Sequence, residues 1–248
     1  MKKLFNISIL MWVTLLKCRA QEGIELVKGA IGFNYAYRQA YRSTNGFSAN
    51  VQITIPDPKE PIVETIRLEQ NDLFLRADFN LRSLKSIPPA KQEAMSACGL
   101  NEMILLHDLV RTNSAIVFPK AKCFVVVAPN SDICRFREEA DGSKQENKEI
   151  CTKRVGGKIL RQVLHAEPGS TGCALVWEQE DLNNFPVSID AGSSGKTILF
   201  VTKSVDLQRP TRERFAIPKN YTLYPDISSL RTAIVGRFLQ EKALNDKQ

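Results

Sequence analysis

One stretch of the sequence resembles a nucleotide-binding loop. Residues Asp190 to Thr197 read Asp-Ala-Gly-Ser-Ser-Gly-Lys-Thr, and this run ends as a phosphate-binding loop does, with Gly-Lys-Thr. That loop needs a glycine where Asp190 stands and it opens a helix. The residues that follow, Ile198 to Val201, instead have the composition of a β-strand. We therefore expect a glycine-serine turn between two strands, with no nucleotide bound.

The chain has few histidines that could serve in catalysis or metal binding. His107 and His165 are the only histidines, and neither belongs to an H-x-x-x-H or H-E-x-x-H metal motif. No G-x-S-x-G nucleophile elbow accompanies them. His107 follows the apolar run Ile104 to Leu106, which predicts a polar residue at the end of a strand. No spacing selects two carboxylates for acid–base work, so we predict no enzyme activity, no metal and no cofactor.

The cysteines do not form a metal-binding pattern either. Beyond Cys18 there are five, an odd number without a C-x-x-C pair, at positions 98, 123, 134, 151 and 173. At least one thiol therefore stays free in any pattern of disulfides within the chain. Cys134 and Cys151 flank the polar segment 138–149 and could close it as a hairpin. Buried free thiols that act as small hydrophobic residues are the other interpretation.

The first twenty residues have the pattern of a secretory signal peptide. Met1-Lys2-Lys3 precedes a mostly apolar run from Leu4 to Leu16, and Cys-Arg-Ala at 18–20 places small residues three and one before the expected cleavage site. The run is shorter than the about 20 apolar residues that a membrane-spanning helix needs. Lipid attachment at Cys18 would need a small residue where Lys17 stands. We expect residues 21–248 to be exported, to a bacterial periplasm or beyond.

Charge and length limit the classes of partner. The chain has 34 basic and 27 acidic residues. Four of the basic residues and none of the acidic ones lie in residues 1–20, which leaves an excess of three positive charges in the exported part. So small an excess does not favour nucleic acid or an acidic polymer. Residues 21–248 are long enough for one large β-domain with a sizeable core, so we predict a single domain.

Most of the exported part reads as short β-strands. Residues 51–55 alternate strictly between apolar and polar side chains, and Asn45-Gly46 before them predicts a hairpin with residues 33–38. Residues 62–68 and 73–79 predict a second hairpin, in which the four residues between them form the turn. Such alternation is typical of antiparallel strands with one apolar face. Further strands are expected at 103–107, 114–118, 122–128, 158–165, 173–178, 185–190 and 197–205, and a charged loop at 130–147.

Two helices interrupt and follow the strands. Pro88-Pro89 begins a run of helix-forming residues that ends before Gly99, which is typical of a short helix. Residues 225–242 form the second helix, and Asp226 or Ser228 can cap its start. Its apolar residues recur at helical spacing and form one stripe: Ile227, Leu230, Ile234, Phe238 and Leu239. We expect this stripe to pack on the sheet as a fixed or a moving lid.

An apolar sheet face under helices is either a filled core or the wall of a cavity, because both are lined by the same residue types. The candidate lining residues come from the early strands and the last helix: Tyr35, Tyr37, Val51, Ile53, Ile55, Ile234 and Phe238. A cavity would hold an acyl chain or another apolar ligand, at about 0.8 kcal/mol per buried CH₂. A filled core would instead leave a structural or protein-interaction module that uses the charged loop as its contact surface.

Several stretches of the sequence follow the pattern of a known group of proteins. They are Arg76 to Asn80, Ile87 to Met95, Gly99 to Met103, Ile116 to Pro129, Val176 to Val187 and Arg214 to Tyr224. The most specific parts are Trp177-x-x-x-Asp-Leu-x-x-Phe185-Pro-Val and Phe215-x-x-Pro-x-x-Tyr221. Over most of residues 46–242 the chain resembles uncharacterised exported bacterial proteins, a domain-of-unknown-function family related to the LolA/LolB-type lipoprotein carriers.

The resemblance implies an α+β fold in which a curved antiparallel β-sheet, the LolA-like half-barrel, is closed by helices. It also implies an apolar cavity able to hold the acyl chain of a lipid or lipoprotein. The family has no assigned catalytic residues, so none carries over to this chain. Trp177 and Phe185 would anchor a strand-turn-strand corner, and Tyr221 would fix the chain where it enters the last helix.

Overall fold

The computed structural model describes residues 46–56, 61–72, 74–80, 89–108, 113–127, 147–166, 173–193 and 196–245. Two α-helices lie in this part of the chain, α2 (Pro89–Ala97) and α3 (Ile227–Asn245), with two short 3₁₀ helices, η1 (Glu180–Leu182) and η2 (Arg212–Phe215). The strands are β1 (Gly46–Ile55), β2 (Ile62–Asn71), β3 (Phe74–Asn80), β4 (Glu102–Asp108), β5 (Ser114–Phe118), β6 (Cys123–Val127), β7 (Asn147–Val155), β8 (Lys158–Ala166), β9 (Cys173–Gln179), β10 (Phe185–Ser193), β11 (Lys196–Asp206) and β12 (Thr222–Tyr224).

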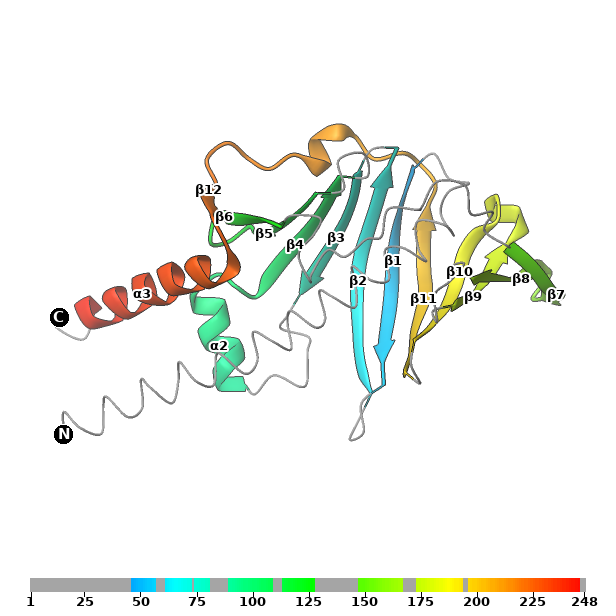
Figure 1. Ribbon diagram of the computed structural model, residues 1–248, viewed down its shortest axis with the longest axis horizontal. Coiled ribbons are helices and arrows are strands. Elements are labelled where there is room, and N and C mark those ends of the chain that lie inside the picture. The colour runs from blue at the N-terminus through cyan, green and yellow to red at the C-terminus, as the bar shows by residue number, and fades with distance from the viewer. Residues whose placement is uncertain are drawn as a thin grey trace.

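These twelve strands form one large sheet (Figure 1), in the order β12-β6-β5-β4-β3-β2-β1-β11-β10-β9-β8-β7. Every neighbouring pair is antiparallel except β12 and β6, which are parallel. The sheet is curved, and it is open because its end strands β7 and β12 lie far apart. The predicted curved antiparallel sheet is therefore confirmed for the described residues.

One face of the sheet, here called the apolar face, carries a continuous band of buried side chains. Successive side chains of a strand point to opposite faces, so cross-strand partners share a face. The register pairs one buried row from β6 to β1: Val125, Ile116, Leu105, Ala77, Leu68 and Ala49. A second buried row continues from β1 to β8: Ile53, Phe200, Ile189, Val176 and Val163. Strict alternation thus produces a hydrophobic core that spans most of the sheet.

The opposite face is crossed by the connection between β11 and β12, residues 207–221, here called the crossover segment. In Figure 1 it runs from β11 past β1 to β4 before it reaches β12. Phe215 stacks on Phe74 of β3 with ring centroids 6.0 Å apart. Ile217 and Tyr221 pack on a second apolar cluster of Leu106, Ala115 and Val117. The Tyr221 hydroxyl also donates to the Pro119 carbonyl at 3.2 Å.

Helix α2 begins and ends as its sequence predicts. The described helix starts at Pro89, and Gly99 beyond its end has a φ of +69°. The Leu100 N–H donates to the Met95 carbonyl at 2.8 Å and the Gly99 N–H to the Ser96 carbonyl at 3.0 Å. This pair of bonds is a Schellman motif, and its usual hydrophobic contact is supplied by Leu100 and Met95, which both pack on the main core.

Helix α3 is capped by Asp226, one of the two residues predicted for that role. The Ser229 N–H donates to Asp226 Oδ1 at 2.7 Å, and the Ser229 hydroxyl donates to the second carboxylate oxygen at 2.9 Å. The backbone hydrogen bond from Ser229 is the main reason that the pKa of Asp226 lies below its usual value. The charged cap also faces the positive end of the helix dipole.

Two local predictions are wrong, and one strand was not predicted. Both edges of β1 are occupied, by β2 and β11, so residues 33–38 cannot pair with it in a hairpin. Residues 69–71 are not a turn but the end of β2, because their side chains are buried or paired on the sheet. Strand β7 was not expected, since its residues are mostly polar and all of those from 148 to 155 are exposed. Residues 33–38 themselves lie outside the described part of the chain.

The stretch Asp190 to Thr197 resembles a nucleotide-binding loop, but its described residues lie in strands β10 and β11. Strands β10 and β11 are antiparallel, with Ser193 opposite Lys196 and Gly192 opposite Thr197. Lys196 therefore opens a strand, whereas the lysine of a phosphate-binding loop opens a helix.

Two glycine substitutions test the backbone argument. Gly99→Ala places a Cβ 2.9 Å from the Ala121 nitrogen in a left-handed conformation, so it should destabilise the fold by about 1–2 kcal/mol or more. Gly236→Ala, within α3, meets no atom within 4 Å and should stabilise the fold by about 0.4–1 kcal/mol. Urea denaturation of the two variants measures both changes. Equal effects of the same sign would contradict the assigned conformations.

Candidate functional site

The structure brings three of the seven candidate lining residues into one hydrophobic core. Val51 and Ile53 of β1 are 0% and 4% exposed, and Ile234 of α3 is 4% exposed. All three belong to the main apolar cluster. Ile55 ends β1 and Phe238 lies in α3, but their side chains are outside the described part, as are Tyr35 and Tyr37 altogether. The cavity-lining role of these residues stays a prediction.

Helix α3 packs on one end of the sheet. Its described contacts with strands are chiefly to β6 and β12, and Figure 1 shows it beside these strands. Leu230 and Ile234 are buried there, and Ile227 is half-buried against the same core. This part of the predicted apolar stripe is confirmed. Arg237 donates to the Tyr224 hydroxyl at 3.0 Å and so ties the helix to β12.

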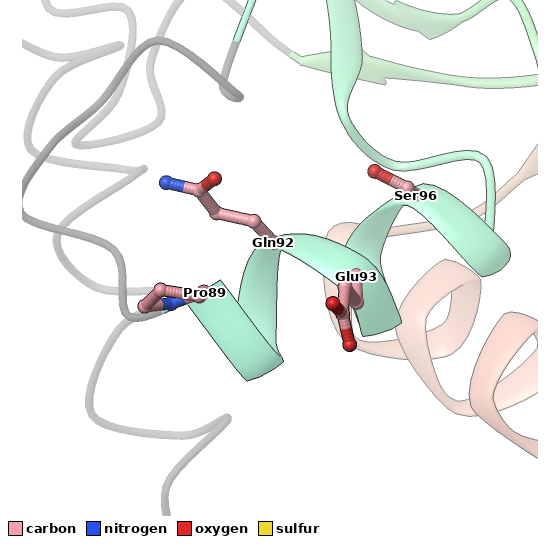
Figure 2. A pocket seen from close by; sticks show the side chains of 4 residues that line it. All are labelled: Pro89, Gln92, Glu93 and Ser96. Carbon is pink, nitrogen blue, oxygen red and sulfur yellow. The ribbon is translucent and has the colours of Figure 1, made fainter.

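A shallow depression lies along helix α2 (Figure 2). It has a volume of about 360 Å³ and is lined by Pro89, Gln92, Glu93 and Ser96, which follow one face of the helix. Met95 of the same helix packs on the core. Three of the four lining side chains, Gln92, Glu93 and Ser96, are polar.

His107 and Ser114 form a buried polar pair on the apolar face. They are directly opposed on β4 and β5, and His107 Nδ1 lies 2.9 Å from Ser114 Oγ. Their exposed fractions are 0% and 1%. A serine–histidine bond can activate a nucleophile, but a substrate must reach it. The neighbouring Asp108 points to the other face, because side chains alternate along a strand. The pair therefore belongs to the core, near the end of β4 where His107 was expected.

The most densely charged site in the described chain surrounds Glu69, on the face opposite the apolar one. Its carboxylate is 2% exposed. Arg214 of η2 binds it in bidentate fashion, with Nε at 3.1 Å from Oε2 and Nη2 at 2.9 Å from Oε1. Arg67 donates at 2.8 Å, and Arg76 lies at 3.9 Å. Arg76 also binds Asp78 at 2.7 Å and donates to the Arg214 carbonyl.

These contacts keep Glu69 ionised. Burial raises the pKa of Glu69, but the hydrogen bonds and charges of Arg214 and Arg67 outweigh it, so the pKa lies below its usual value. The site therefore holds an anion that pins the crossover segment to β2 and β3. Sequence reasoning missed it because it placed Glu69 in a turn. The available signal was the alternation of polar residues at 67, 69 and 71, which continues the strand beyond residue 68 but does not point to Arg214.

Three of the described cysteines form no disulfide. They are Cys98, Cys123 and Cys151, so Cys151 does not close a hairpin with Cys134. Burial raises the pKa of the Cys123 thiol, which packs in the core as a small hydrophobic residue. Among the described residues no cluster of three or more histidine, cysteine or acidic side chains could hold a metal ion. No helix in that part of the chain is both long and apolar enough to cross a membrane.

No protein-family model matches this sequence, and no curated protein matches it. Solved structures that resemble the chain include an uncharacterised conserved protein from Thermus thermophilus, with a TM-score of 0.47 and 9% identity over 79% of this chain and 99% of the other. A LolA superfamily protein from Nitrosomonas europaea has a TM-score of 0.37 and 10% identity over 74% of this chain and 96% of its own.

A DUF1329 family protein from Desulfovibrio piger gives a TM-score of 0.36 and 8% identity over 74% of this chain and 96% of its own. Uncharacterised and LolA-like proteins are thus among the structures similar to this chain, as the sequence resemblance predicts. At 8–10% identity the similarity concerns the backbone alone. The fold and the sites described above follow from the strand order and contacts of this chain itself.

Glu69→Gln tests the charged site. A lowered pKa in the folded state stabilises the fold above the unfolded value, about pH 4.3, and this stabilisation is lost as pH falls through the folded pKa. Arg67 and Arg214 are about half exposed and solvent screens them, so we expect a loss of only about 1–3 kcal/mol at pH 7. The difference from the unchanged protein should shrink towards pH 3.

Glu102→Gln is the matched control, because Glu102 pairs with Lys120 at 2.8 Å while both side chains are more than 40% exposed. It should cost less than about 1 kcal/mol at any pH. Urea denaturation between pH 3 and pH 7 measures both variants. If the two lose the same stability, Glu69 does not hold the crossover segment.

Proposed function

We propose that this chain is an exported protein that binds an acyl chain or another apolar ligand between the apolar face of its sheet and helix α3. The observation that carries the proposal is the width of the apolar face. Its buried rows run from β6 to β8, a span of ten strands or about 43 Å at 4.8 Å per strand. Of the described helices, α2 and α3 both pack on this core, and the strand contacts of α3 are chiefly to β6 and β12.

The chemistry of this face suits an apolar ligand. Its described side chains are mainly aliphatic, with the aromatic pair Phe47 and Phe185 in edge-to-face contact at 5.0 Å. Each methylene that a ligand buries is worth about 0.8 kcal/mol, so even part of an acyl chain would bind usefully. Helix α3 is the element best placed to act as a lid, because it is joined to the sheet through the three-residue strand β12.

The proposal also includes export of the chain from the cytoplasm. The signal-peptide pattern of residues 1–20 motivates it, and the carrier resemblance of residues 46–242 agrees with it. In this view the cleaved chain works outside the cytoplasm, where lipids and lipoproteins need shelter from water. Mass spectrometry of the chain recovered from a periplasmic extract gives its first residue, which should be Gln21.

A second candidate function is a structural or protein-interaction module with a filled core. The specific observation in its favour is the packing of Val51, Ile53 and Ile234, which all lie in one continuous cluster of buried residues. In this view the exposed charged surfaces of the sheet carry the contacts to partners.

Ile234→Ala distinguishes the two functions. In a filled core it should cost about 2–5 kcal/mol, because the cavity it leaves cannot collapse completely. In a ligand-binding site it should cost clearly less stability but weaken retention of parinaric acid, a fluorescent fatty acid. Denaturation with and without the fatty acid, together with fluorescence titration, gives both numbers.

Thr232→Ala is the control on the exposed side of the same helix. Its hydroxyl donates only to the Ser228 carbonyl within α3, at 2.9 Å, so the change should be within about 0.5 kcal/mol and should not affect the fatty acid. A full loss of stability in Ile234→Ala without any binding of parinaric acid to the unchanged protein would exclude the ligand-binding function.

A further inference from the structure

Strands β7 and β8 form a hairpin whose turn end is exposed. Every residue from Lys148 to Lys158 is exposed. Gly156 and Gly157 form its turn with φ values of +56° and +79°, and no atom lies within 4 Å of where a Cβ would stand on either. Positive φ at both central residues gives the tight turn of a two-residue hairpin. In Figure 1 the hairpin lies at the end of the sheet remote from α3.

This hairpin carries a concentration of positive charge. Lys148, Lys153, Arg154 and Lys158 lie on it, against one acidic residue, Glu149. Arg154 and Lys158 flank the turn and form no ion pair within the described part of the chain. By contrast, Arg161 further along β8 is bound by Glu178 at 2.8 Å. The exported part as a whole has an excess of only three positive charges, so the hairpin concentrates cations that the rest of the surface balances.

Apolar and aromatic side chains accompany these cations. Ile150 and Val155 are 50% and 52% exposed. The Lys153 ammonium lies 3.7 Å from the centre of the Trp177 ring. The register places Lys153 opposite Leu160, and Gln162 opposite Trp177, so these side chains share one face of the sheet. Val155 and Lys158 are paired on the same face, so cations, an exposed aliphatic residue and a tryptophan lie together there. This surface is amphipathic rather than simply charged.

We propose that this hairpin docks the protein on an anionic lipid surface. Each lysine or arginine near such a surface contributes about 1 kcal/mol, and the exposed aliphatic side chains and Trp177 suit the boundary between headgroups and acyl chains. The proposal does not depend on an acyl ligand in the core. A carrier would take up its ligand from this lipid surface, and a protein-interaction module would act on it.

Addition of a partner strand to β7 is less favoured by the same residues. The pairing of β7 with β8 shifts register between Glu149 and Cys151, and lysines lie on both sides of this irregularity. Irregular pairing and lysines on an end strand are the usual means by which proteins prevent edge-to-edge pairing. Edge protection does not account for Arg154 and Lys158, because they flank the turn and not the free edge. We therefore assign these charges to a lipid surface.

The test uses the exported chain, residues 21–248, in which Trp177 is the one tryptophan. We expect vesicles with about one third phosphatidylglycerol, and not neutral phosphatidylcholine vesicles, to shift Trp177 emission to the blue, and brominated lipid to quench it. Arg154→Glu with Lys158→Glu should raise the lipid concentration for half-maximal quenching at least about tenfold. Added salt should also raise the lipid concentration for half-maximal quenching, since it screens exposed charges.

The matched control is Arg212→Glu with Lys219→Glu, which makes the same change in net charge on the crossover segment. This control should keep the half-maximal concentration within about twofold, and far-ultraviolet circular dichroism checks the folding of both variants. The proposal is overturned if neutral vesicles quench Trp177 as strongly as anionic ones. It is also overturned if charge reversal at Arg154 and Lys158 leaves the quenching unchanged. Binding of a soluble polyglutamate peptide in preference to the vesicles overturns it in favour of an acidic protein partner.

Discussion

The ion pair between Glu69 and Arg214 is the interaction on which the arrangement of the last forty residues depends. Strand β11 lies in the middle of the sheet and β12 at its end, so the chain must cross six strands between them. A segment of this length gains little from backbone pairing, and loop closure opposes its ordering. The bidentate bond from Arg214 and the Arg76 bond to the Arg214 carbonyl fix it to β2 and β3. Phe215 and Tyr221 then add apolar and polar contacts beyond that point.

This anchor has a consequence for the opposite face. Once the crossover segment is held, β12 pairs with β6 in a parallel register, and α3 starts directly after it with Asp226 as its cap. The helix then turns its stripe of Leu230 and Ile234 to the apolar face. A charged site on one face therefore determines where the apolar helix lies on the other. If α3 moves as a lid, its hinge is the short stretch between β12 and Ile227, and the anchor need not be broken.

Much of this fold could be predicted from local sequence, because strand alternation and helix termini are short-range effects. The runs at 62–68, 114–118 and 197–205 and the helix ended by Gly99 are found where their patterns indicate them. Pairing between distant strands is not a local property, and so the partner of β1 was wrongly predicted. Strand β7 was missed because an exposed end strand needs no apolar face; Gly156-Gly157 between two extended runs was the signal for it. Of the candidate site, Val51, Ile53 and Ile234 share one core, whereas Glu69 could not be recognised without knowing that Arg214 reaches it.

The two ends of the sheet differ in a way that follows from how each edge is protected. At one end β12 is short and α3 packs beside it, so few backbone groups are left for another strand. At the other end β7 extends over nine residues, of which 148–155 have exposed side chains, and irregular pairing and lysines discourage further strands. Protection of the β7 edge against pairing with another strand is served by polar and cationic side chains. It does not require that Trp177, Ile150 and Val155 lie beside these charges. Because edge protection explains the lysines and leaves these apolar side chains unexplained, they are the part of this end of the sheet that indicates an interface with lipid.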